Sequence, residues 1–168
     1  MSMALLSDQT YGCRTLPRQQ RPRPALPITM DEAPPFRVAF GDESVFVFDQ
    51  EPDEWFMPLL SQVCDLGLLP PNWNTYGAQP IDPDTAAFAV FLLLKLLSAD
   101  DPVPSIVPTS RGGILFEWHE EGIDLEVDIR SPSSMHVSFG DRGREEERER
   151  AGFDYIQERM NILRGRLE

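Results

Sequence analysis

The chain has 168 residues, and its 28 acidic and 15 basic side chains give it a formal net charge of −13. That length is typical of one domain with tails. An acidic protein repels nucleic acid and anionic membranes and attracts basic proteins, so we expect a basic protein partner and neither a nucleic-acid nor a membrane partner. No apolar run reaches the roughly 18 residues of a membrane span.

The compartment expected from the sequence is the cytoplasm. The first ten residues, MSMALLSDQT, lack the charged and apolar regions of a secretory signal. Cys13 and Cys64 are far apart and make neither a disulfide framework nor a metal set. A reducing compartment is therefore expected.

Composition divides the chain into three segments. Residues 1–35 are rich in Pro and Arg and predict a disordered tail, in which RPRPALP is a plain linker or a polyproline II ligand. Residues 36–140 predict a single α+β domain. Within residues 31–140, 19 acidic and four basic side chains give a net charge of −15. Residues 141–168 predict a charged C-terminal helix.

The first half of the predicted domain contains a hairpin, two helices and an aromatic loop. Apolar alternation predicts a hairpin over residues 36–49, and the apolar stripe that follows predicts a helix over residues 51–66 with Cys64 buried. The stretch PPNWNTYGAQPIDPD is a loop by composition, and its Trp73 and Tyr76 either fill the core edge or form a recognition surface. Residues 85–98 are apolar nearly all round and predict the core helix.

A central antiparallel hairpin over about residues 113–130 is the clearest prediction. Its two strands alternate apolar and polar residues with a period of two. Folding at Glu120 and Glu121 would place Trp118 opposite Ile123 and Glu117 opposite Asp124. The apolar face then packs on the helix of residues 85–98. The other face carries acidic side chains that are either simply solvated or directed at a basic partner or a cation.

The C-terminal part predicts one more strand and then a helix. Residues 134–139 alternate, with His136 and Ser138 facing outward. The run GREEERER is expected to be helical through acid–base pairs three and four residues apart. Beyond it lies an apolar heptad stripe of Phe153, Ile156, Met160, Leu163 and Leu167. We expect this stripe either to pack on the sheet, to form a homodimer or to bind a partner helix.

Two stretches, NWNTYGAQPI and VPTSRGGILFEW, resemble a group of short bacterial hypothetical proteins. That group shares an N-W-D/N-x-Y-G-x-x-P-I loop, an apolar helix and a P-T-x-x-G-G-x-x-x-E-W strand entry. The resemblance covers about residues 70–130 and implies no activity. It implies one recurring module and, since small bacterial modules of this kind are often half of a gene pair, a partner encoded next door. The module would contain Trp73, Tyr76, Gly77, Gly112, Gly113, Glu117 and Trp118.

No catalytic constellation is readable, so we expect a protein that is not an enzyme and needs no cofactor. The chemical alternative is a metal site or metal-dependent enzyme built on His119, Glu117 and His136 with the neighbouring acids. A further alternative is a structural subunit that assembles through the C-terminal helix.

The first prediction is therefore a non-enzymatic acidic protein-binding module, of accessory, antitoxin or immunity type. The residues expected to meet its basic partner are Trp73, Tyr76, Glu117, Glu120, Glu121, Asp124, Glu126 and Asp128.

Overall fold

The computed structural model confirms the predicted α+β class, an antiparallel sheet packed on helices; the sheet has five strands, and helices cover one of its faces. The structure describes residues 36–40, 44–48 and 51–167, so the predicted tail of residues 1–35 lies outside the described residues. The strands run in chain order as a meander: β3 (Ser105–Pro108), β4 (Ile114–Glu120), β5 (Ile123–Ser131), β6 (Ser134–Asp141) and β7 (Arg144–Glu149).

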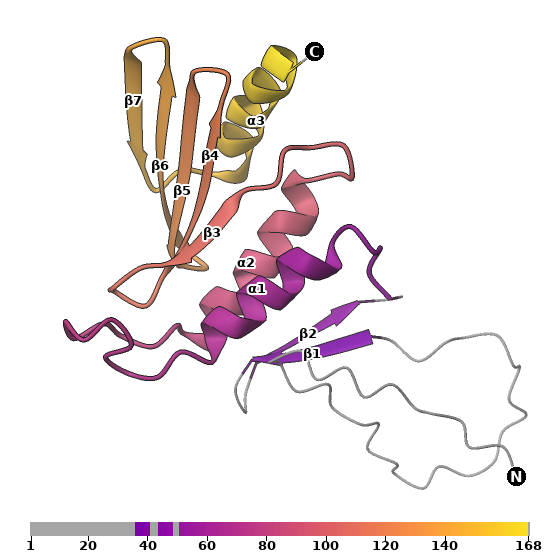
Figure 1. Cartoon of the computed structure of the whole chain (residues 1–168), viewed down its shortest axis with the longest axis vertical. Coiled ribbons are helices and arrows are strands. Elements are labelled where there is room, and N and C mark those ends of the chain that lie inside the picture. The colour runs from indigo at the N-terminus through magenta and orange to yellow at the C-terminus, as the bar shows by residue number, and fades with distance from the viewer. Residues whose placement is uncertain (1–35, 41–43, 49–50, 168) are drawn as a thin grey trace, which may run out of the picture.

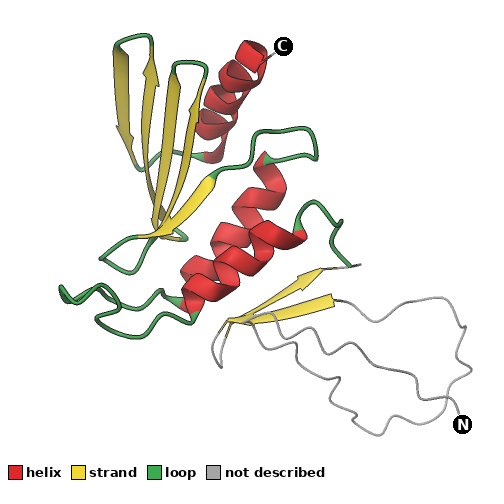
Figure 2. Ribbon diagram, in the orientation of Figure 1, coloured by secondary structure: helices red, strands yellow, loops and turns green. Residues whose placement is uncertain are grey.

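Helices α1 (Met57–Gly67) and α2 (Pro83–Leu96) lie between this sheet and a separate hairpin of β1 (Phe36–Phe40) and β2 (Ser44–Phe48) (Figure 1). Helix α3 (Phe153–Leu167) packs on the sheet against β5 (Figure 2). The helix predicted over residues 51–66 begins only at Met57, and residues 51–56 form coil and turn before it.

Helix α2 forms where the sequence places a strong start signal. Asp82 is its N-cap, and its carboxylate accepts hydrogen bonds from the backbone N–H groups of Asp84 and Thr85. Pro83 occupies the first turn, where a missing N–H costs nothing. The buried side of α2 then faces the sheet, α1 and the β1–β2 hairpin; it includes Ala86, Ala89, Val90, Leu92, Leu93 and Leu96.

The central hairpin has the predicted faces but a different register. Trp118 pairs with Leu125 and Glu117 with Glu126, two residues away from the predicted partners. The loop consists of Glu121 and Gly122, which both have positive φ (47° and 79°). Because two positive φ values define the tight hairpin turn that matches strand twist, the chain folds one residue later than predicted. A shift of two residues keeps the same side chains buried.

The charged run at 144–149 is a strand, whereas the sequence analysis predicted a helix there. Arg142 and Gly143 form a second turn with positive φ (50° and 85°), which returns the chain beside β6. The sheet therefore continues past residue 140, and the C-terminal helix begins only at Phe153.

The apolar stripe of α3 packs on the sheet of the same chain. Ile156, Met160 and Leu163 are fully buried, whereas Leu167 is exposed. On α1, Cys64 is buried as expected, but it is disulfide-bonded, which the cysteine spacing did not predict; Cys13 lies outside the described residues. Within the described part of the chain, no helix is both long and apolar enough to cross a membrane.

Candidate functional site

The solvent-facing side of the five-stranded sheet collects most of the acidic side chains predicted to bind a partner. Residues that alternate with the buried ones on β4 and β5, and residues of β7 that pair with the outward positions of β6, place seven carboxylates there. We call them the acidic face: Glu117, Asp124, Glu126, Asp128, Glu145, Glu147 and Glu149. From the described strands, the charged or titratable companions on this side are Arg130, His119 and His136.

One row of the acidic face runs across four neighbouring strands. Glu117 lies directly opposite Glu126, and Ser138 separates Glu126 from Glu147. Like charges that face each other on neighbouring strands destabilise a sheet by about a few tenths of a kcal/mol. None of these three glutamates makes an ion pair with a described residue. The row is therefore unfavourable for folding, and no ion pair within the described part of the chain neutralises it.

Three carboxylates of the acidic face have basic partners. Arg130 donates to Asp128 at 2.8 Å and to Glu149 at 3.0 Å. His119 donates its Nδ1 proton to Asp124 at 2.7 Å, and this bond, together with the negative charges of Asp124, Glu117 and Glu126, raises the pKa of His119. The field of the face thus favours positive charge brought near it.

The remaining predicted partner-binding residues do not lie on the acidic face. Glu120 is exposed at the end of β4, on the side of the strand that carries the core residues, and Glu121 is in the turn. Trp73 and Tyr76 lie in the loop between α1 and α2, which reaches the end of the sheet where β3 turns into β4 (Figure 1).

This loop presents Tyr76 on a rigid support. Tyr76 is 91% exposed, whereas Trp73 is half-buried and donates from its indole N–H to the carbonyl of Gln79. Asn72 and Asn74 hold the loop through their carboxamide oxygens, which accept from backbone N–H groups two to five residues further on. Ala78 and Ile81 fill the core edge, so the recognition-surface alternative fits Tyr76 better than the core-filling one.

The structure brings together the two stretches that carry the resemblance. The backbone N–H of Gln79 donates to the carbonyl of Ser110 at 3.0 Å. A Cβ on Gly112 would lie 2.7 Å from the carbonyl oxygen of Pro80, so only glycine permits this approach. The aromatic loop and the β3–β4 turn therefore form one end of the molecule.

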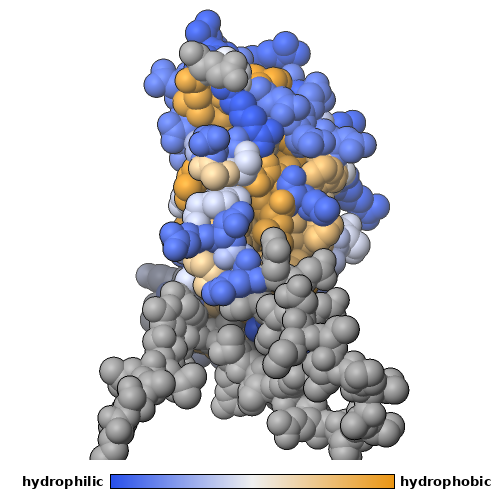
Figure 3. All heavy atoms as spheres, turned by 90° about the vertical axis from the view of Figure 1, so that its right-hand side faces the viewer, coloured by the Kyte–Doolittle hydropathy of each residue, from blue (hydrophilic) through white to orange (hydrophobic). Residues whose placement is uncertain are grey.

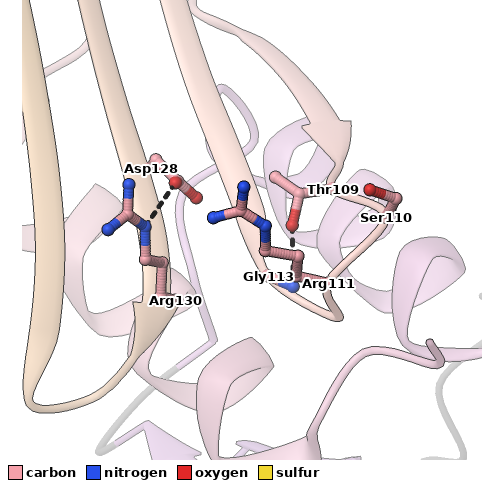
Figure 4. Close-up of a pocket in the computed structure, with 6 residues that line it drawn as sticks. All are labelled: Thr109, Ser110, Arg111, Gly113, Asp128 and Arg130. Atoms are coloured by element: carbon pink, nitrogen blue, oxygen red, sulfur yellow. Dashed lines mark hydrogen bonds and ion pairs between the residues drawn. The ribbon is translucent and has the colours of Figure 1, made fainter. Parts of the chain in front are cut away.

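A cavity of about 320 Å³ lies at the same end, where the β3–β4 turn meets β5. Its lining residues are Thr109, Ser110, Arg111, Gly113, Asp128 and Arg130 (Figure 4). Asp128 belongs to the acidic face as well, so the cavity adjoins that face. The sequence analysis did not predict this cavity.

The possible metal ligands that the structure brings together differ from the predicted set. Glu117, His119 and Glu126 each offer a ligand atom within 4.8 Å of the others. His136 is not in this group, because it lies opposite Asp128 and 3.8 Å from Glu149. Sequence reasoning did not find Glu145, Glu147 and Glu149, because it assigned them to a helix; the Arg142–Gly143 pair after an alternating strand was the available signal.

The assembly prediction depends on side chains that are already used within the chain. The buried part of the α3 stripe contacts the sheet, and the large apolar side chains that α3 leaves exposed are Ile162 and Leu167. Elsewhere, Figure 3 shows hydrophobic surface between hydrophilic regions on the side of the molecule away from the β4–β7 strands. Phe91 on α2 is 42% exposed, with the Lys95 ammonium 5.7 Å from its ring.

Comparison with protein-family models, with curated proteins and with solved structures found no match for this chain.

Proposed function

We propose that this protein is a non-enzymatic binding module whose acidic face docks a basic surface of another protein. The observation that carries the proposal is the row of Glu117, Glu126 and Glu147, whose like charges oppose folding and which make no ion pair with a described residue. An arrangement that costs stability is retained more readily when it serves binding. Complementary charge across an interface mainly increases the association rate and the specificity.

The proposed footprint extends from the acidic face towards Tyr76. Asp128 adjoins the cavity, Ser110 on the cavity wall accepts from Gln79, and the carbonyl of Gln79 accepts from Trp73. An exposed tyrosine on a loop held by internal hydrogen bonds is a typical anchor residue, because it contributes area at small entropic cost. The partner is proposed to be basic and, as the resemblance implies, to be encoded next door.

The experiment compares two triple variants with the same change in charge. In the face variant, Glu117, Glu126 and Glu147 become Gln, which breaks no described ion pair. In the control variant, Glu51→Gln, Glu54→Gln and Asp65→Asn remove three exposed carboxylates around α1. Proteins captured from extracts by the wild type should be retained by the control variant and lost by the face variant. Equal capture by both variants would reject the proposal.

A metal-binding protein is the second candidate, because Glu117, His119 and Glu126 place imidazole and carboxylate donors within 4.8 Å of one another. Asp124 would orient the imidazole, as carboxylates do for metal-binding histidines. Elemental analysis of protein purified without chelator tests this candidate. His119→Ala should remove a stoichiometric metal that His136→Ala leaves in place, and protein free of metal would exclude it.

A further inference from the structure

The cavity beside the β3–β4 turn has the polar groups of a small ligand site. Its volume of about 320 Å³ is at the lower end of the range for small-molecule sites. The turn supplies Thr109, Ser110, Arg111 and Gly113, and β5 supplies Asp128 and Arg130 (Figure 4).

The walls of the cavity are held in place before any ligand binds. Thr109 accepts from Gly113 through its side-chain oxygen at 3.0 Å, and it exchanges backbone hydrogen bonds with the same turn. A Cβ on Gly113 would lie 2.6 Å from the carbonyl oxygen of Ile129, so the turn lies tightly against β5. Such preorganisation reduces the entropic cost of binding.

Asp128, one of the residues that line the cavity, has an acceptor atom without a partner. One carboxylate oxygen, Oδ2, accepts from Arg130 at 2.8 Å, whereas Oδ1 is buried and has no hydrogen-bond partner among the described residues. A buried acceptor without a donor costs about 1–3 kcal/mol. A ligand that brings an N–H or ammonium group to Oδ1 recovers that cost.

Arg111 supplies the complementary group. Its side chain extends from the turn towards Asp128 and Arg130 (Figure 4), and it makes no ion pair with a described residue. Arg130 is already paired with Asp128 and Glu149. Arg111 is therefore the guanidinium available for an anion, and a guanidinium binds a carboxylate through two parallel hydrogen bonds.

We propose that this cavity binds a ligand that carries a carboxylate next to an N–H donor, as the end of a peptide chain or a free α-amino acid does. The carboxylate pairs with Arg111 and the Ser110 hydroxyl, and the N–H group donates to Asp128 Oδ1. This site goes beyond the docking function of the acidic face, because it requires neither Glu117 nor Glu126 nor Glu147.

Chemical-shift titration of the labelled full chain tests the site with four probes. N-acetylalanine has the carboxylate and an amide N–H, alanine has the carboxylate and an ammonium, propionate lacks the nitrogen, and N-acetylalanine methylamide lacks the carboxylate. Binding of N-acetylalanine or alanine should saturate, should be several-fold tighter than that of the other two, and should shift the amide resonances of Ser110 and Gly113. The tighter of the two identifies the source as a chain end or a free amino acid.

Variants assign the two contacts. Arg111→Gln should weaken binding of the better probe by about tenfold, whereas Arg142→Gln, in the exposed β6–β7 turn, should leave it unchanged. Asp128→Asn should abolish the preference over propionate. The triple face variant should bind the probe at least as tightly as the wild type, because it removes negative charge near the cavity, and this result separates the proposal from the docking function. Equal binding of propionate, no saturation at tens of millimolar probe, or equal effects of the two arginine variants would overturn the proposal.

Discussion

Arg164 on α3 forms a two-pronged ion pair with Asp101, in the loop between α2 and β3. Its Nε and Nη2 donate to the two carboxylate oxygens at 2.6 and 2.8 Å, and Nη2 also donates to the carbonyl of Leu96 at the end of α2. One side chain thus joins the C-terminal helix to the core helix. The Arg164 guanidinium, with help from the Ser98 side chain and backbone, lowers the pKa of Asp101 from 3.8 to about 2.

We predict that Asp101→Asn lowers the free energy of unfolding by about 2 kcal/mol at pH 7. Because the pKa is lowered in the folded state, the contribution is present above the unfolded value near 4 and is lost as the pH falls towards 2. Urea denaturation of the wild type and the variant should therefore converge in acid. Asp100→Asn, at an exposed neighbouring position, is the control and should change little. A difference that does not depend on pH would contradict this explanation.

Gly113→Ala should destabilise the protein by about 1–3 kcal/mol, because the new methyl group would meet a strand carbonyl at 2.6 Å. The backbone of Gly113 does not have positive φ, so the cost is steric. Gly165→Ala is the opposite case, since this position is helical and nothing lies within 4 Å of the added Cβ. It should stabilise by about 0.5–1 kcal/mol. Thermal and urea denaturation measure both changes, and an equal response at the two glycines would show that the turn is not tightly packed on β5.

Glu126→Gln should increase the stability by a few tenths of a kcal/mol at low salt, because it removes the repulsion between Glu126 and Glu117. Added salt screens that repulsion and should reduce the difference between variant and wild type. Glu54→Gln, on the exposed stretch before α1, is the matched control. If Glu126→Gln is destabilising at low salt, the Glu126 carboxylate makes a net favourable interaction in the folded protein, which contradicts the claim that its repulsion from Glu117 opposes folding.

Asp124→Asn should lower the pKa of His119, since the hydrogen bond from His119 to Asp124 is the largest cause of its raised value. Because the pKa of His119 is raised in the folded state, the interaction of protonated His119 with Asp124 stabilises the fold. This stabilisation is present below the ordinary pKa of histidine and is lost as the pH rises through the raised value. Titration of the imidazole resonances measures the change directly. An unchanged pKa in the variant would mean that the wider field of the face, and not this bond, holds the proton.

Strand faces and the core helix could be predicted from the sequence because they depend on local patterns. The alternation in β5 and the nearly continuous apolar run of residues 85–98 indicate which side chains are buried, whatever their partners. Register could not be predicted in the same way. Residues Glu120, Glu121 and Gly122 allow more than one turn, and a shift of two residues leaves every buried side chain buried.

The error at β7 has a tertiary cause. Opposite charges at helical spacing in residues 144–149 favour a helix locally, yet in the structure Glu146 pairs with Arg159 of α3 at 2.7 Å. Arg148 and Arg159 also stack on the ring of Tyr155. Such contacts between distant segments override weak local propensity. The cavity could not be predicted from the sequence either, because Arg111 and Asp128 line the same space only through the pairing of β4 with β5.

The most direct measurement of the central claim is the salt dependence of the association rate with a captured partner. We predict that the rate for the wild type and for the control triple variant falls steeply as ionic strength rises. The face triple variant should associate more slowly at low salt and should lose most of that dependence. The same salt dependence in all three proteins would contradict the claim that the acidic face directs binding.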